Sequence, residues 1–224
     1  MQYPVVATDF DGTLAEEGRV SQETRAAIVR VRKSGRRVIL ITGRELDNLQ
    51  EVFPTLDLFD VVVAENGALV YDPVTHAEKF LGPPLPSRFI KELQRDGVRP
   101  LSIGRRIVAT LRPHETKVYQ LIRELHLSLQ VIFNRESVMV LSAGMDKAAG
   151  LKAVLTEFGV SSDHVLGFGD AENDYAFLGL CGFSVAVANA IPSLKERVDL
   201  VTAGSCGNGV VEVLNQLLTL GTLP

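Results

Sequence analysis

Two aspartates separated by a single residue, Asp9 and Asp11, stand in the run DFDGT at residues 9–13. The run follows the apolar segment Pro4–Ala7, whose composition is typical of a buried strand. Carboxylates two residues apart point the same way along an extended backbone, and Gly12 allows the chain to turn sharply after them. Buried carboxylates cost free energy unless an opposite charge pairs with them. The run therefore predicts a site where a divalent cation meets a phosphate group.

Three further polar clusters stand where later strands end or helices begin. They are Thr42-Gly43-Arg44 after the apolar run 37–41, Lys147 at the start of a predicted helix, and Asp170 with Asn173 and Asp174 after the run 164–168. Open parallel sheets bind ligands beyond the carboxyl ends of their strands. We therefore expect all the clusters to meet in one crevice, although they are far apart in the sequence.

The acidic residues of these clusters are suited to hold a metal ion. Asp9, Asp11 and Asp170 offer hard oxygen ligands, and Mg²⁺ prefers a few carboxylates together with water and phosphate oxygens. Asn173 and Asp174 can orient a metal-bound water or the lysine. We predict Mg²⁺ as the cofactor. Asp9 and Asp11 taken alone could instead form a solvated turn, because Asp-Gly pairs are common in turns.

The remaining polar residues match the needs of a phosphate group. Thr42 supplies a hydroxyl, Gly43 leaves backbone N–H groups accessible at a helix N-terminus, and Lys147 supplies a balancing positive charge. A lysine at a helix start is unfavourable against the helix dipole, so its position itself indicates a role. We expect Arg44 either to tie down its helix or to contact the substrate.

The rest of the sequence predicts the elements that position these clusters. Apolar strands alternate with helices before residue 72 and again after residue 146, which indicates a parallel sheet in an α/β fold. A Pro-rich stretch at 82–86 then marks a domain boundary. The insert that follows reads as a small α+β unit with helices at 87–95 and 115–125, and strands at 106–111, 129–133 and 137–141.

The motifs of the haloacid dehalogenase (HAD) superfamily are similar, in order, to Asp9-x-Asp11-Gly12-Thr13, Ile41-Thr42-Gly43-Arg44, Asp146-Lys147 and Gly169-Asp170-x-x-Asn173-Asp174. The segments Glu65-Asn66-Gly67-Ala68 and Asn208-Gly209-Val210 resemble the type IIB, or Cof-like, branch. That branch carries its cap between the second and third motifs. One departure is Ala148, where these relatives usually have glycine after the lysine.

The resemblance implies a Rossmann-like core with a parallel sheet, formed by residues 1–82 and 146–224, and an α+β cap at 83–145. It also implies a Mg²⁺-dependent phosphatase of small phosphate monoesters. Asp9 would attack the phosphorus to form an aspartyl-phosphate, and Asp11 would protonate the leaving oxygen and then deprotonate the water. Asp9, Asp170 and the backbone carbonyl of Asp11 would hold Mg²⁺. Thr42 and Lys147 would stabilise the phosphoryl oxygens.

The insert is expected to select the substrate, a small phosphorylated metabolite such as a sugar phosphate or phosphoglycolate. Arginine matches carboxylate or phosphate groups bidentately. Of the basic residues in the insert, Arg106 and Arg135 are the favoured substrate contacts, although the whole set could also be a solvated face. The other basic residues considered are Arg105, Arg112 and His114.

Two rival functions stay open on the sequence. A phosphomutase of the same superfamily would return the phosphoryl group to the sugar instead of releasing phosphate. A non-catalytic module that binds a phosphorylated ligand would keep the fold without turnover, which the presence of all the acidic residues disfavours.

Net charge, cysteine content and hydropathy limit the classes of function and the compartments that the protein can have. A formal net charge of −4 argues against general nucleic-acid binding, which usually shows a basic footprint. Cys181 and Cys206 are too isolated for a metal site and indicate free thiols in a reducing compartment. No signal peptide and no membrane span are evident, so we predict a cytoplasmic protein. The sequence leaves open whether it is a monomer or a homodimer.

Overall fold

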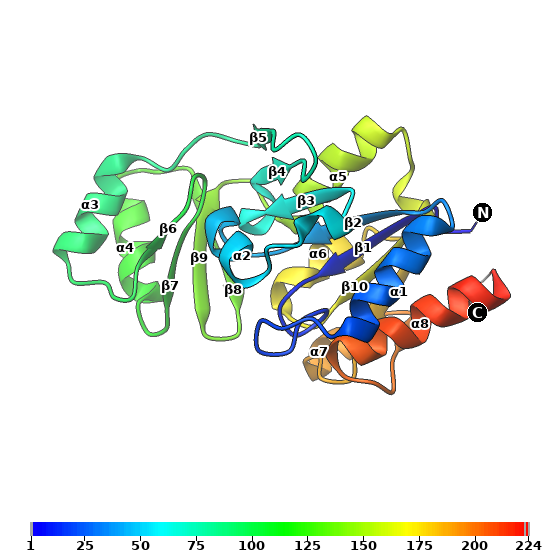
Figure 1. The fold of residues 1–224 in the computed structure, drawn as a ribbon. Coiled ribbons are helices and arrows are strands. Elements are labelled where there is room, and N and C mark those ends of the chain that lie inside the picture. The colour runs from blue at the N-terminus through cyan, green and yellow to red at the C-terminus, as the bar shows by residue number, and fades with distance from the viewer. Residues whose placement is uncertain (1, 222, 224) are drawn as a thin grey trace.

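The computed structural model describes residues 2–221 and 223. They form an eight-stranded sheet with helices on both faces, and a four-stranded antiparallel sheet beside it that carries α3 and α4 (Figure 1). This is the α/β architecture with an inserted α+β unit that the sequence predicts. Among the described residues, no helix is both long and apolar enough to cross a membrane.

The large sheet has the strand order β12-β11-β10-β1-β2-β3-β4-β5. The first six strands of this order are parallel to one another, and β4 runs antiparallel to both of its neighbours, β3 and β5. Their bounds are Leu200–Val201 (β12), Phe183–Ala186 (β11), Val165–Gly169 (β10), Val5–Asp9 (β1), Arg37–Ile41 (β2), Val61–Ala64 (β3), Leu69–Tyr71 (β4) and Glu78–Phe80 (β5). The central strands are apolar throughout because both of their faces are covered.

Successive side chains of each central strand enter two different cores. Val6 and Leu40 pack with helices α1 (Gln22–Lys33), α2 (Leu46–Val52) and α8 (Cys206–Leu220). Ala7 and Ile39 pack on the opposite face with α5 (Lys147–Phe158), α6 (Tyr175–Leu178) and α7 (Pro192–Lys195). Short 3₁₀ turns complete this part at Leu56–Leu58 (η1), Glu65–Gly67 (η2), Ser162–His164 (η3) and Glu172–Asp174 (η4).

The inserted unit has its own apolar core. Its sheet has the order β6-β7-β9-β8, with bounds Ser102–Ile103 (β6), Val108–Leu111 (β7), Ser137–Ser142 (β9) and Leu129–Asn134 (β8). Helices α3 (Ser87–Arg95) and α4 (Glu115–Glu124) pack against it through Phe89, Leu93, Val118 and Leu121. A separate small cluster contains Ala68 of the large unit together with Ile107, Met139 and Leu141 of the insert, so the two units share apolar contacts. We keep residues 83–145 as the proposed extent of the cap.

Some local elements differ from the expectations. The helix expected to begin at Gly43 begins at Leu46, because Glu45 keeps an extended conformation with a ψ of 144°. The strand expected at 106–111 begins at Val108. The residues after Asp170 form two short pieces, η4 and α6. The short strands β5 and β6 were not expected, since all five of their residues are exposed and show no apolar alternation.

Candidate active site

A buried ammonium group shared by two carboxylates forms the floor of the site. Lys147 is the first residue of α5 and is fully buried, and its Nζ donates to Asp9 Oδ1 at 2.5 Å and to Asp174 Oδ1 at 2.6 Å. Asp9 ends β1, and its side chain is 6 % exposed. The structure thus brings together residues that lie 138 and 27 positions apart along the chain.

The start of α5 is held against the turn η2, and this fixes Lys147. Asp146 caps the helix by accepting a hydrogen bond from the backbone N–H of Ala149 at 2.8 Å. Gly67 has a φ of +102°, and a Cβ there would lie 1.8 Å from the carbonyl oxygen of Asp146. Only glycine permits this approach, which places the helix start, and hence the lysine, beneath the strand end.

Burial and charge act together on the floor. Burial disfavours the charged form of Lys147, but attraction to Asp174 and Asp9 and the hydrogen bonds to them outweigh it and raise its pKa. Burial also raises the pKa of Asp9; Lys147 opposes this shift, while Asp174 and Asp170 add to it. Asp9, Asp170 and Asp174 face two cations, Lys147 and Arg135, so one negative charge remains in excess at a buried place, which favours a further cation.

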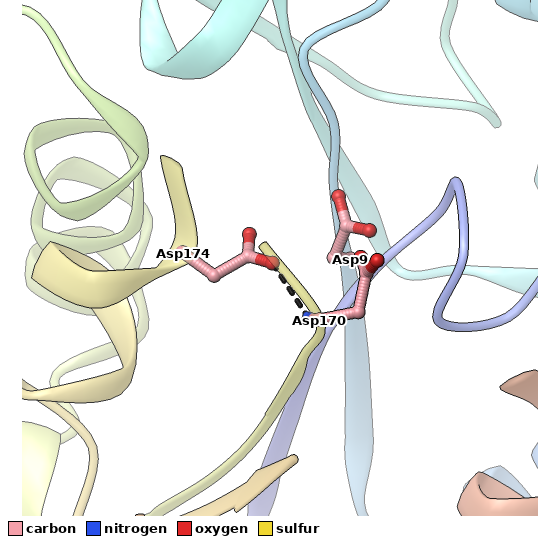
Figure 2. A group of neighbouring side chains, drawn as sticks. All are labelled: Asp9, Asp170 and Asp174. Carbon is pink, nitrogen blue, oxygen red and sulfur yellow. Dashed lines mark hydrogen bonds between the residues drawn. The ribbon is translucent and has the colours of Figure 1, made fainter. Parts of the chain in front are cut away.

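Asp170, which directly follows β10, completes the acidic cluster. One oxygen each from Asp9, Asp170 and Asp174 lies within 4.8 Å of the other two. Figure 2 shows the Asp174 carboxylate accepting from the backbone N–H of Asp170, a bond of 2.8 Å; Ala171 N–H donates to the same oxygen at 3.0 Å. Asp174 therefore hydrogen-bonds both the loop after β10 and the lysine. Asp9 and Asp170 are the better candidates to hold a metal ion.

The loop after β1 lies directly against Asp170. Gly12 has a φ of +79°, and a Cβ there would stand 2.5 Å from Asp170 Oδ2. The hydroxyl of Thr13 donates to Asp170 Oδ1 at 3.2 Å. Asn189, which the sequence did not single out, donates to the Gly12 carbonyl at 2.7 Å. The close approach explains why glycine follows the two aspartates.

Residues after β2 border the floor on the other side. Thr42 is fully buried, and its Oγ1 accepts from the backbone N–H of Arg44 at 3.1 Å. A Cβ at Gly43 would lie 3.6 Å from Asn173 Nδ2, which itself donates to Asn66 Oδ1 at 3.1 Å. The second and fourth predicted clusters therefore meet directly.

Arg44 clamps the second aspartate of the opening run. Its Nε and Nη2 donate to Asp11 Oδ2 and Oδ1, both at 2.7 Å, while Nη1 donates to Asn48 at 2.6 Å. The side chain of Asp11 is 40 % exposed and that of Arg44 is 25 % exposed. The contact with Asn48 ties Arg44 to α2, which is the first of the two alternatives expected for it, and the pair with Asp11 was not expected.

A cavity of about 290 Å³ opens above these residues. The large unit contributes acidic, basic and amide side chains to it, and the insert contributes mostly small neutral ones. The lining residues are Asp9, Asp11, Gly43, Arg44, Glu45, Asn48, Ser102, Ala109, Asn134, Ser137 and Met139. Sequence reasoning missed Glu45 and Asn48 at the start of α2 and the residues that the insert contributes to the cavity, because no local pattern marks which face of a helix or strand turns toward it.

The two favoured arginines of the insert lie in different places. Arg135, at the β8–β9 turn, donates to Asp170 Oδ2 at 2.6 Å, and its backbone N–H donates to Glu172 at 3.1 Å. Arg106 lies with its guanidinium carbon 4.1 Å from the centre of the Phe80 ring and donates to the carbonyl oxygen of Arg105. The structure therefore brings Arg135 to the site but does not bring Arg106 to the cavity.

The other basic residues of the insert are also engaged elsewhere. Arg105 pairs with Asp47 and Glu78, with nitrogen–oxygen distances of 3.0 and 2.8 Å. His114 contacts the carbonyl oxygen of Arg99 through Nε2 at 2.9 Å. Arg112 pairs with Glu115 at 3.3 Å.

A buried glutamate, Glu65, joins the two units through a contact that the sequence did not predict. Glu65 is fully buried, and its carboxylate accepts from the backbone N–H groups of Arg105 at 2.9 Å and Arg106 at 2.5 Å. Burial raises the pKa of this carboxyl, although the hydrogen bonds from these two N–H groups oppose the shift. Near the two arginines, the insert thus contacts the large unit through both backbone N–H groups and side chains.

Comparison with known proteins agrees with this geometry. A family model described as haloacid dehalogenase-like hydrolase matches residues 6–98 and 102–214. A phosphoglycolate phosphatase of Methanothermobacter thermautotrophicus is 27 % identical, covering 95 % of this chain and 98 % of that protein. Phosphoglycolate phosphatase 2 of Saccharolobus solfataricus is 31 % identical over 96 % of this chain and 92 % of its own length.

Solved structures show the same fold. A haloacid dehalogenase-like hydrolase from Bacteroides thetaiotaomicron superposes with a TM-score of 0.81 at 18 % identity, covering 96 % of this chain and 100 % of its own. A HAD/COF-like hydrolase from Plasmodium vivax gives a TM-score of 0.82 at 22 % identity, with coverage of 98 % and 96 %. The core with an inserted unit is therefore shared with these hydrolases.

Proposed function

The chain belongs to the haloacid dehalogenase-like hydrolase family and is a phosphatase, and we propose that it hydrolyses small phosphate monoesters through a phosphoaspartate on Asp9 with Mg²⁺ as cofactor. One observation carries the proposal. The Asp9 carboxylate ends a central strand, is bound by the buried Lys147, and lines the cavity that a substrate can enter.

Each residue of the site has a proposed role that follows from its position. Asp9 attacks the phosphorus, and the bond to the leaving oxygen breaks as the Asp9 oxygen forms its own. Asp11, on the cavity side, gives the leaving oxygen a proton and later takes one from the attacking water. Lys147, the Thr42 hydroxyl and the N–H groups near Gly43 hold the phosphoryl oxygens. Asn173 and Asp174 keep their neighbours in place.

The acidic cluster suits the proposed metal. Asp9 and Asp170 with the backbone carbonyl of Asp11 supply only hard oxygen donors, and their oxygens lie where the buried charge is in excess. Bound Mg²⁺ would neutralise this charge and stabilise negative charge on the phosphoryl oxygens. Lys147 and Asp174 hold the Asp9 carboxylate and the Asp170 loop in place for it.

The substrate is proposed from cavity size and relatives together. A cavity of about 290 Å³ suits a small metabolite. The relatives named phosphoglycolate phosphatase make phosphoglycolate the first candidate and sugar phosphates the second.

Two free thiols, Cys181 and Cys206, agree with the predicted cytoplasmic location.

A phosphate-release screen tests the function. Purified protein with Mg²⁺ would be offered phosphoglycolate and a panel of sugar phosphates, with the Asp9→Asn variant as the matched control. We expect free phosphate from at least one ester and none above background from the variant. Rearranged sugar phosphate without free phosphate would support the phosphomutase alternative. No release from any ester would contradict the proposal.

A further inference from the structure

We propose that Arg44 is a positioning residue, which acts on the reaction only by holding the Asp11 carboxylate toward the leaving group. The proposal rests on the function proposed above, because it assigns a support to the acid and base of that reaction. It starts from the bidentate pair between the two side chains, which joins two clusters 33 positions apart in the chain.

Asp11 needs such a support because of where it lies. It stands two residues beyond the end of β1, before Gly12 with its φ of +79°, and its side chain is 40 % exposed. An exposed carboxylate on a turn can rotate between several rotamers. A general acid, however, must stay within hydrogen-bond reach of one particular oxygen. The guanidinium fork fixes both the position and the plane of the carboxylate.

Arg44 is itself fixed from several sides. Its backbone N–H donates to the Thr42 hydroxyl at 3.1 Å, and its carbonyl accepts from Glu65 N–H at 2.9 Å. Nη1 donates to Asn48 in the first turn of α2, and the guanidinium carbon lies 5.7 Å from the centre of the Phe10 ring. These contacts hold Arg44 between Thr42, a proposed phosphate contact, and Asp11, the proposed acid.

The same contacts argue against a direct role on the phosphoryl group. All three guanidinium nitrogens donate to protein oxygens, two to Asp11 and one to Asn48. Binding a phosphate through the fork would require release of the Asp11 carboxylate. Lys147 already provides a positive charge beside Asp9. Arg44 is therefore placed to serve Asp11.

Leaving-group dependence separates the two roles. The quantity to measure is kcat/KM, which reports the steps up to phosphoryl transfer, for 4-nitrophenyl phosphate and for an alkyl phosphate. Nitrophenolate departs without a proton, whereas an alkoxide needs the acid. For Arg44→Lys, which keeps the charge without the fork, we expect a loss of about 100-fold with the alkyl ester and less than about threefold with the nitrophenyl ester.

A double mutant tests whether Arg44 acts through Asp11. If it does, Arg44→Lys should cost no further activity toward the alkyl ester once Asp11→Asn is present, because the effects of residues that act as one unit are not additive. Arg32→Gln removes a comparable pair with Asp60, outside the cavity, and should leave both esters at the wild-type rate. If Arg44→Lys does not fold, as judged by its thermal unfolding, Asn48→Ala loosens the same guanidinium and should show the same selectivity, more weakly.

An equal loss for both esters, or additive losses in the double mutant, would overturn the proposal and show that Arg44 acts on the phosphoryl group. That outcome would leave the proposed phosphatase function intact. A wild-type protein that hydrolyses neither these esters nor any of the metabolites screened would instead remove the proposed function and this inference with it.

Discussion

The floor of the site (Asp9, Lys147, Asp170 and Asp174) and its rim (Asp11, Arg44 and Arg135) are both built from ion pairs. They differ in their access to water. On the floor, Lys147 is fully buried between Asp9 and Asp174. On the rim, the Arg135 side chain that pairs with Asp170 is 53 % exposed, whereas the Arg44 side chain is 25 % exposed and is held by Asp11 and Asn48 together. Charges that cannot reach water must keep their partners, whereas exposed pairs can be exchanged for solvent or ligand. The floor therefore fixes the proposed nucleophile, and the half-exposed Arg135 is the rim contact with which a ligand can compete.

The largest effect on stability should come from breaking the floor. Lys147→Met leaves two buried carboxylates without their ammonium partner, and we expect the free energy of unfolding to fall by about 3 to 5 kcal/mol. Lys79→Met is the matched control, because Lys79 pairs with Glu157 on the surface with side chains 56 % and 50 % exposed. That change should cost about 1 kcal/mol or less. Denaturant unfolding measures both, and equal losses would contradict the distinction between floor and rim.

The buried carboxyls should also make magnesium binding depend on pH. Burial raises the pKa of Asp9 and, with help from Asp174 and against Arg135, that of Asp170. A carboxyl whose pKa is raised in the folded state favours the fold at low pH, and this contribution is lost as the pH rises through the folded pKa. At the higher pH, bound magnesium should restore the lost stability, because a metal ion binds the deprotonated carboxylates.

Thermal unfolding with and without Mg²⁺ checks the sign of this effect. We expect the rise in Tm on adding Mg²⁺ to be larger near neutral pH than in mild acid, where protons occupy the carboxyls. The Asp170→Asn variant should show a much smaller rise at both pH values. A shift that grows as the pH falls would contradict the assignment of Asp9 and Asp170 as metal ligands.

The smallest effect should come from the rim contact of the cap. Arg135, in the β8–β9 turn, is half exposed and pairs with the buried Asp170 of the large unit. Arg135→Gln should change KM by about fivefold or less and lower the Tm less than Lys147→Met, because Arg135 is 53 % exposed and only its partner Asp170 is buried. Arg106→Gln, outside the cavity, should leave KM unchanged. Steady-state kinetics would refute the placement if the Arg106 variant had the larger effect.

The same division explains how far the sequence could predict the molecule. Floor residues such as Asp9, Lys147 and Asp170 sit at strand ends or a helix start, so parallel strand order alone brings them together. The α/β fold followed from apolar runs buried on both faces. The rim depends on how the insert packs on the core, and no local pattern encodes this. Arg106 and Glu65 show the difference. Arg106, predicted to contact the substrate, packs its guanidinium against Phe80. The buried Glu65 carboxylate contacts the insert by accepting from two backbone N–H groups.

Direct detection of phosphate on Asp9 tests the central claim most closely. In the Asp11→Asn variant, 4-nitrophenyl phosphate should still transfer its phosphoryl group, because its leaving group needs no acid, while hydrolysis of the intermediate slows for want of a base. After rapid acid quench, mass spectrometry of the peptide that contains Asp9 should show a nearly stoichiometric phosphate. Release of phosphate without any label on that peptide would contradict the account.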